Sequence, residues 1–413
     1  MNTYALVILA ALLIDFLLRL ISSALNLSGL RAKLPAEFHD VYDAEKYRNS
    51  QNYVHALTRF QGFADVFNLV ITLGFWFLGG FRFLDQKVRA WEVGPILEGL
   101  LYIGVLAAAM AILSIPLNVY RTFVIEERFG FNKTTVKTFI FDLLKGIVLT
   151  GIIGGCLLAA ILGLFQHAGQ YAWLWCWMAS ALFALFLQCI APTWIMPLFN
   201  RFTPLEEGEL REAIESYAAT ARFPLQNIFV MDGSKRSSKS NAFICGFGKY
   251  KRIALFDTLI SNHPVNELVA VLAHEIGHFK KKHIRDGVIL SIMELAVMFF
   301  LMSIFLSRQG LFEAFFVEET SIYVGLVLFS LLYSPLQLIL SILLHLWSRK
   351  NEYEADRFAA QSIDDPEDMV KVLKKLAADN LSNLTPHPFH VFVNYSHPPM
   401  LARIKAIRSE CST

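Results

Sequence analysis

Long apolar runs, separated by polar segments, dominate this chain. Seven of the runs reach about 20 mostly apolar residues, which is enough for a helix to cross a bilayer. The pattern therefore predicts a polytopic membrane protein with seven spanning helices. The expected spans are residues 4–25, 63–84, 96–119, 139–165, 171–197, 287–306 and 321–346.

The number of basic residues between the apolar runs alternates between high and low. Lys and Arg are enriched in cytoplasmic loops, and short loops carry most of this signal. The alternation supports seven crossings, with the N-terminus outside and the segments 198–286 and 347–413 in the cytoplasm. The Lys plus Arg counts are 5 in 27–62, 2 in 85–95, 4 in 120–138, 0 in 166–170, 12 in 198–286 without Arg285, 1 in 307–320 and 9 in 347–413.

The composition agrees with a membrane protein. Of 413 residues, 55% are hydrophobic and 17% charged, whereas soluble domains carry about 25% charged residues. The net charge of +2 gives no reason to expect a nucleic-acid partner. The five cysteines include no CxxC pair, which argues against a disulfide framework or a Cys-type zinc site. The first apolar run lacks a clear small-residue cleavage site, so we expect a retained anchor.

Charged side chains interrupt several expected spans. Asp142 and Lys145 are three residues apart in the fourth span and could pair on one helix face, and Glu294 lies in the sixth. Charges at membrane depth usually face a protein interior or water. Two interpretations remain open: side chains that reach the membrane surface, or a helix bundle with a wet interior.

The polar segments divide the expected fold into four parts. Residues 1–197 form a membrane domain of five spans, and 287–346 add two more. Residues 198–286 form a soluble segment, and 347–413 a second one. The predicted fold class is therefore mainly α, with a small α+β unit beside a membrane bundle. The soluble elements expected from periodicity and turn signals are helices at 206–221, 265–282, 367–378 and 399–409, and strands at 227–231, 242–247 and 252–256.

His274, Glu275 and His278 form an HExxH motif on the predicted helix 265–282. Residues four apart share one face of a helix, so both imidazoles can reach one metal ion. Glu275 lies beside them, where its carboxylate can take a proton from a water molecule that the metal activates. The apolar run 268–273 favours a site backed by a core over two surface histidines. The motif therefore indicates a zinc site.

A catalytic zinc ion needs a third protein ligand and an open position. The metzincin pattern would place a His where this chain has Ile284, and His283 follows three lysines, so we interpret His283 as a surface residue. Glu352 and Asp356 are better candidates, because they lie four apart on a predicted helix. One carboxylate can bind the metal while the other holds a ligand imidazole by its remaining N–H. Glu354 points about 160° away from that face and is expected to be solvated.

Together with other segments, these motifs resemble the integral membrane CAAX prenyl endopeptidases, which are zinc enzymes of the gluzincin type. The resemblance covers nearly the whole chain. It implies tilted helices around a large water-filled chamber, with one zinc ion per chain facing inward at the cytoplasmic end. The matching segments are 274–278, Glu352 with Asp356, Ser240-Asn241-Ala242 running into 246–248 and 251–259, 120–126, 130–133 and 395–399.

The resemblance also implies roles for the metal-site residues. Glu352 would be the third zinc ligand beside His274 and His278, and Asp356 would orient a ligand imidazole. Glu275 would be the catalytic base.

Substrate contacts follow from the resemblance as well. The strand that begins at Asn241 and Ala242 would be an edge on which the substrate lies as an added strand. His397 would face the oxyanion of the tetrahedral intermediate. Arg403 would line the substrate-binding site.

The expected function is a zinc-dependent membrane endopeptidase that cleaves near the C-terminus of prenylated CaaX-type substrates. Its expected partners are a peptide or prenylated peptide and the lipid bilayer, in the endoplasmic reticulum of a eukaryote or the inner membrane of a bacterium. A broader quality-control protease is one alternative. A seven-span transporter or receptor with a structural zinc is another, but such a site needs a fourth protein ligand. A site-2-type intramembrane protease is disfavoured, because Glu267 and the lysines at 280–282 bracket the motif.

Overall fold

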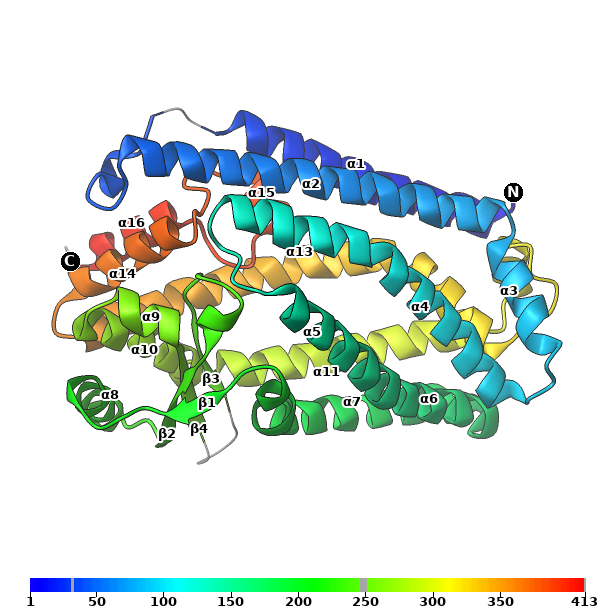
Figure 1. The fold of residues 1–413 in the computed structure, drawn as a ribbon. Coiled ribbons are helices and arrows are strands. Elements are labelled where there is room, and N and C mark those ends of the chain that lie inside the picture. Colours follow the sequence, from blue (N-terminus) through cyan, green and yellow to red (C-terminus); the bar gives the residue numbers. More distant parts are fainter. Residues whose placement is uncertain (31–32, 246–250, 412–413) are drawn as a thin grey trace.

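The computed structural model describes residues 1–30, 33–245 and 251–411 (Figure 1). Within these residues, seven helical segments are long and apolar enough to cross a membrane, which confirms the predicted number. They are α1 (Thr3–Ser28), α2 (Ala44–Phe77), α4 with the π-helical turn after it (Pro95–Glu126), α5 with α6 (Val136–His167), α7 with its flanking turns (Gly169–Leu198), α11 (His283–Phe305) and α13 (Ile322–Ser362). Within the composite spans, α4 is Pro95–Tyr120, α5 Val136–Leu149, α6 Gly155–His167 and α7 Ala172–Ile190.

The second span is longer at its start than the apolar pattern of 63–84 predicts. α2 begins directly after Asp43, whose side chain accepts a hydrogen bond from the backbone N–H of Lys46 and so caps the helix. At its other end, Gly79 adopts a left-handed conformation with φ 75°, and a separate helix, α3 (Gly80–Arg89), follows. The first half of α2 was not predicted as part of the span, because it contains no long apolar run.

α13 is a single helix of 41 residues. The hydroxyl of Ser321 caps it by accepting a hydrogen bond from the backbone N–H of Val324. The apolar pattern ends at 346, but the helix continues to Ser362, because residues 347–362 contain no Gly or Pro to interrupt it. The extension carries both acidic residues that the sequence singles out as ligand candidates.

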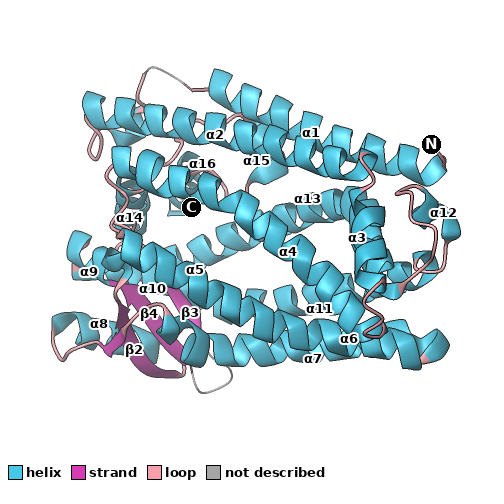
Figure 2. Ribbon diagram, turned by 45° about the vertical axis from the view of Figure 1, so that its right-hand side comes forward, coloured by secondary structure: helices cyan, strands magenta, loops and turns pink. Residues whose placement is uncertain are grey.

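The soluble unit contains a four-stranded sheet in the order β1-β2-β4-β3 (Figure 2). β2 and β4 are parallel, whereas β3 pairs with β4 and β1 with β2 in antiparallel fashion. The three predicted strands are confirmed within the described residues, and residues 246–247 of the second strand lie outside them. β1 was not predicted, because three residues are too few to show a period. The elements are β1 (Phe202–Pro204), α8 (Glu209–Thr220), β2 (Leu225–Met231), β3 (Ala242–Cys245), β4 (Lys251–Phe256), α9 (Asp257–Asn262) and α10 (Val265–Lys280).

The two soluble segments share one hydrophobic core. Buried Ile214, Leu255 and Leu272 from the first segment lie in the same cluster as Leu373 and Ile404 from the second. The sheet, α8, α10, α14 and α16 therefore gather at one end of the molecule, whereas the N-terminus and α3 lie at the other, in both ribbon views. The remaining helices are α12 (Gln309–Glu313), α14 (Pro366–Asp379), α15 (Pro388–Asn394) and α16 (Met400–Cys411).

Asp142 and Lys145 do not pair with each other. Asp142 accepts hydrogen bonds of 2.8 and 2.9 Å from Nε and Nη2 of Arg236. Lys145 donates to the carbonyl oxygen of Leu198 at 2.6 Å. Spacing along one helix could not reveal these partners, which tie the fourth span to Arg236 of the soluble unit and to the end of the fifth span.

Candidate metal centre

α10 presents the histidines of the HExxH motif from a helix anchored in the core. Leu268, Leu272 and Ile276 are buried in the core of the soluble unit, and α10 also contacts α8, α13 and α14. His274 is buried and His278 partly buried. This agrees with the helical, core-backed context that the apolar run predicts.

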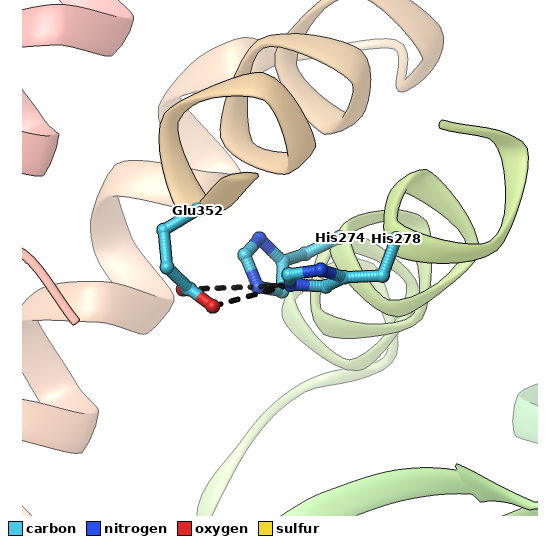
Figure 3. Close-up of side chains that lie close together, drawn as sticks. All are labelled: His274, His278 and Glu352. Atoms are coloured by element: carbon cyan, nitrogen blue, oxygen red, sulfur yellow. Dashed lines mark hydrogen bonds and ion pairs between the residues drawn. The ribbon is translucent and has the colours of Figure 1, made fainter. Parts of the chain in front are cut away.

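His274, His278 and Glu352 bring three donor atoms together, with Glu352 reaching across from α13 (Figure 3). The two Nε2 atoms of the histidines are 3.2 Å apart, and Oε1 and Oε2 of Glu352 lie 3.3 Å from His278 Nε2 and 3.5 Å from His274 Nε2. Ligands bound about 2.0–2.1 Å from a tetrahedral zinc ion lie roughly 3.3 Å apart. The two imidazole nitrogens and the carboxylate of Glu352, which turns one oxygen toward each of them, therefore have the spacing of ligands to one zinc ion.

Glu352 also shows a feature expected of a metal ligand. Its Oε2 atom is buried and accepts no hydrogen bond from the described residues. It forms an ion pair with Nη1 of Arg403 at 3.4 Å but no hydrogen bond among these residues. A buried carboxylate oxygen without a hydrogen bond is costly, so a metal cation beside it would be stabilising.

Close packing of α10 against α13 sets the distance between the ligands. A Cβ atom on Gly277, between the two histidines, would lie 3.1 Å from both Cα and the carbonyl oxygen of Ala355. Only glycine permits this approach without a backbone shift. The approach brings Glu352, on the adjacent turn of α13, within reach of the histidines.

Asp356 lies one turn after Glu352 and contacts the opposite side of a ligand imidazole. Its Oδ1 is 2.8 Å from Nδ1 of His274. Arg403, on α16, donates to both oxygens of Asp356, at 2.7 Å from Nε and 2.6 Å from Nη2. Its Nη1 is 3.4 Å from Oε2 of Glu352. Arg403 is buried against these carboxylates, and its expected substrate contact stays a prediction.

These neighbours shift the ionisation of the site. Burial alone would lower the pKa of His274, but the hydrogen bond and charge of Asp356 outweigh it and leave this pKa above its ordinary value. Burial raises the pKa of the Glu275 carboxyl, against the opposing effect of the two imidazoles. Burial alone would lower the pKa of Arg403, but the charge and hydrogen bonds of Asp356 outweigh burial and leave this pKa above its ordinary value. The guanidinium therefore stays charged.

His397 lies beside Glu352, at the solvent-exposed side of the group formed by His274, His278 and Glu352, called the ligand group below. Its Nε2 is 3.3 Å from Oε1 of Glu352, and 63% of its side chain is exposed. α13 holds the segment before it: His345 Nδ1 is 3.0 Å from the carbonyl oxygen of Val393, and Arg349 donates to the carbonyl oxygen of Tyr395. Sequence reasoning missed both residues, although their positions one and two turns before Glu352 were a signal.

One residue expected at the surface lies buried beside the site instead. His283 was expected at the surface, but it is only 7% exposed, and its Nδ1 is 3.1 Å from Nδ1 of His278. The expectation for His283 was wrong because Lys282 adopts a left-handed conformation with φ 64°, which turns the first residue of α11 back against α10. Glu354, expected to be solvated, is 34% exposed, and its Oε2 is 3.2 Å from Nε2 of His283.

β3 lies at one edge of the sheet and contacts α10. The exposed Asn241 precedes it, and its side-chain oxygen accepts a hydrogen bond from the backbone N–H of Ala242 at 2.9 Å. The carbonyl oxygen of Asn241 accepts from the backbone N–H of Phe256 at 3.1 Å. The strand thus has the edge position that substrate addition requires, and the substrate contact itself stays a prediction.

An HExxH helix with a further carboxylate beside its histidines, attached to seven helices that can span a membrane, is the arrangement typical of a membrane metallopeptidase. Residues 24–201 match the family described as CAAX prenyl protease N-terminal, five membrane helices, and residues 204–411 match peptidase family M48. The chain belongs to the CAAX prenyl proteases of peptidase family M48.

Relatives and a solved structure support this membership along most of the chain. The CAAX prenyl protease 1 of Saccharomyces cerevisiae is 36% identical over 405 residues, covering 91% of this chain and 88% of the relative. The human CAAX prenyl protease 1 homolog is 32% identical over 424 residues, covering 91% and 89%. The crystal structure of S. mikatae Ste24p superposes with a TM-score of 0.91 at 34% identity, covering 98% of this chain and 99% of that chain. The resemblance noted from the motifs is therefore confirmed.

Proposed function

We propose that this chain is a zinc-dependent endopeptidase that cleaves peptide bonds near the C-terminus of prenylated CaaX-type substrates. The observation that carries the proposal is the group formed by His274, His278 and Glu352. The two Nε2 atoms are 3.2 Å apart, and one carboxylate oxygen of Glu352 lies within 3.3 or 3.5 Å of each, which suits one zinc ion. The relatives named CAAX prenyl protease 1 provide the substrate class.

The protein residues divide the work of peptide hydrolysis. When bound, zinc would act as a Lewis acid on the scissile carbonyl and on a water molecule. Glu275, adjacent to the ligand pair, takes a proton from the attacking water and passes it to the leaving amine. Asp356 fixes the ring of His274 through Nδ1.

The substrate side of the site is formed by His397 and β3. His397, exposed beside Glu352, can donate an N–H to the oxyanion that forms on the scissile carbonyl. An extended substrate adds to the edge of β3 near Asn241 and Ala242, so that main-chain hydrogen bonds hold it across the ligands. This binding mode depends on backbone groups and tolerates varied side chains.

We also assign the orientation and the compartment. The Lys and Arg alternation along the loops supports an outside N-terminus and cytoplasmic catalytic segments. Both catalytic segments lie at the same end of the molecule, which is consistent with this assignment. A eukaryotic host would hold the protein in the endoplasmic reticulum, and a bacterial host in the inner membrane.

The central experiment compares cleavage of a farnesylated and an unfarnesylated CaaX peptide by the purified protein, with and without 1,10-phenanthroline. Cleavage that favours the farnesylated peptide and stops with the chelator is the expected result. Equal, chelator-sensitive cleavage of both would replace the substrate class with a broader quality-control role. Loss of all cleavage while zinc is bound would contradict the endopeptidase and favour a seven-span transporter or receptor.

Glu275→Gln tests the base. The variant keeps the side-chain volume but cannot take a proton, so kcat should fall by about 10²–10⁴-fold while zinc content, measured by atomic emission, stays at one per chain. Glu207→Gln is the matched control, because this carboxylate is 82% exposed. Full activity in Glu275→Gln would refute its role.

A further inference from the structure

We propose that His283 and Glu354 form a positioning pair for the metal ligand His278. The proposal rests on the zinc site of the proposed function. His283 is neither a metal ligand in this arrangement nor a surface residue. It holds the ring of His278 from the side away from the metal, and Glu354 in turn holds His283.

The contacts form a continuous chain from a carboxylate to the ring of His278. Oε2 of Glu354 is 3.2 Å from Nε2 of His283, and Nδ1 of His283 is 3.1 Å from Nδ1 of His278. The other nitrogen of His278, Nε2, belongs to the donor group with Glu352. His283 is only 7% exposed, so water does not compete freely for its bond to His278, whereas Glu354 is 34% exposed.

The metal ligand His278 determines where the protons of these hydrogen bonds lie. A His that binds metal through Nε2 carries its proton on Nδ1. His278 therefore donates, and Nδ1 of His283 must accept. The proton of His283 then lies on Nε2, where it is donated to the carboxylate of Glu354. All hydrogen-bonding groups are satisfied in one tautomeric arrangement, and that arrangement leaves His278 Nε2 free for metal.

The arrangement completes a symmetry between the two ligand histidines. Asp356 contacts Nδ1 of His274 directly at 2.8 Å. His278 reaches its carboxylate, Glu354, through one intervening imidazole. Five consecutive residues of α13 therefore hold all three carboxylates. Glu352 is the proposed metal ligand, Asp356 supports His274, and Glu354 supports His278 through His283.

His283 is poorly placed to be a fourth ligand. Its Nδ1 contacts the nitrogen of His278 that points away from the donor group, and among the described residues the compact donor group contains His274, His278 and Glu352 alone. A closed four-ligand site is not formed, so the position for water stays open.

The test measures zinc affinity of the purified full chain by competition with a chelator, independently of activity. His283→Phe keeps a buried ring but removes the acceptor, so the zinc dissociation constant should rise about 10–100-fold. His283→Asn places an amide oxygen where Nδ1 lay and should restore affinity to within about threefold of wild type. Glu354→Met should weaken zinc binding about tenfold. Arg357→Gln, an exposed position on α13, is the matched control.

A spectroscopic readout separates positioning from a general structural effect. In the Co²⁺-substituted protein, His283→Phe should change the visible absorption bands of the metal, and His283→Asn should preserve them. Unchanged affinity and spectra in both His283→Phe and Glu354→Met would overturn the pair, and so would equal losses in the Asn and Phe variants. Glu354→Met, at a partly exposed position, keeps the test decisive if His283→Phe does not fold. Wild-type protein that binds no zinc would instead refute the proposed function itself.

Discussion

Two buried carboxylates and one buried guanidinium lie at the candidate metal centre. Glu352 and Asp356 place two carboxylates beside a single guanidinium, that of Arg403, and all three groups are buried. One net negative charge remains, which favours a cation bound between neutral His274 and His278. Arg403 therefore orients the carboxylates as well as neutralising one of them.

Arg403→Lys tests whether the planar fork is required. Lys keeps the charge but cannot donate to both oxygens of Asp356 in parallel, so a buried charged hydrogen bond is lost. We expect the free energy of unfolding to fall by about 1.5–3 kcal/mol and zinc affinity to weaken. Scanning fluorimetry and chelator competition measure the two effects.

Arg408→Lys on the same helix is the control. Arg408 also makes a two-point contact, to Glu367 at 2.9 Å for both bonds, but it is 44% exposed. Exposed ion pairs contribute about 0–1 kcal/mol, so this variant should behave like wild type. If Arg403→Lys alters only KM for the peptide and leaves zinc affinity unchanged, Arg403 contacts substrate instead.

The residues of the site differ in how far sequence alone could define them. His274 and His278 follow from helical spacing, because the ligands lie on one element. Glu352 needed the resemblance, since spacing left it equivalent to Asp356. His283 was misplaced because its position depends on the left-handed turn at Lys282, and a lysine gives no signal of that conformation.

At the scale of elements, the site depends on how closely α10 and α13 pack. Gly277→Ala would place a Cβ atom 3.1 Å from the backbone of Ala355, and overpacking of this kind costs about 1–3 kcal/mol. The helices must separate to relieve it, which moves Glu352 away from the histidines. We expect weaker zinc binding and a lower unfolding temperature, measured by chelator competition and scanning fluorimetry.

Gly287→Ala is the matched change on α11. Its Cβ atom would lie 3.5 Å from the ring of Trp347, an ordinary contact, and Ala favours the helix by about 1 kcal/mol. This variant should bind zinc as wild type does. Normal zinc affinity in Gly277→Ala would show that the close approach is not needed for coordination.

Element prediction succeeded where one physical signal dominated. Apolar length identified the seven spans, and alternation identified three strands. It failed where elements lack their own signal: the polar start of α2, the polar end of α13, and α15, whose seven residues pack on α1 and α13. Such segments become helical through tertiary contacts and caps, which a linear pattern does not contain. The chamber implied by the resemblance stays a prediction.

At the scale of the whole molecule, the orientation of the chain across the membrane can be tested by labelling. The assigned orientation places Glu207 in the cytoplasm and Glu318 outside, and both side chains are well exposed, at 82% and 69%. In a background without the five native cysteines, Glu207→Cys should react with an impermeant maleimide in sealed vesicles whose cytoplasmic side faces out. Glu318→Cys should react only after detergent is added. The reverse pattern would invert the orientation.

The chain leaves the ligand group and returns to it by way of the bilayer. After His278 it crosses once along α11 and comes back along α13 to reach Glu352. An odd number of crossings would leave the ligands on opposite faces of the membrane, so the count between them must be even. Binding a metal ion therefore closes a ring of polypeptide that threads the bilayer. A chain that has inserted only one leg of this hairpin cannot assemble the site, which couples coordination to complete membrane insertion.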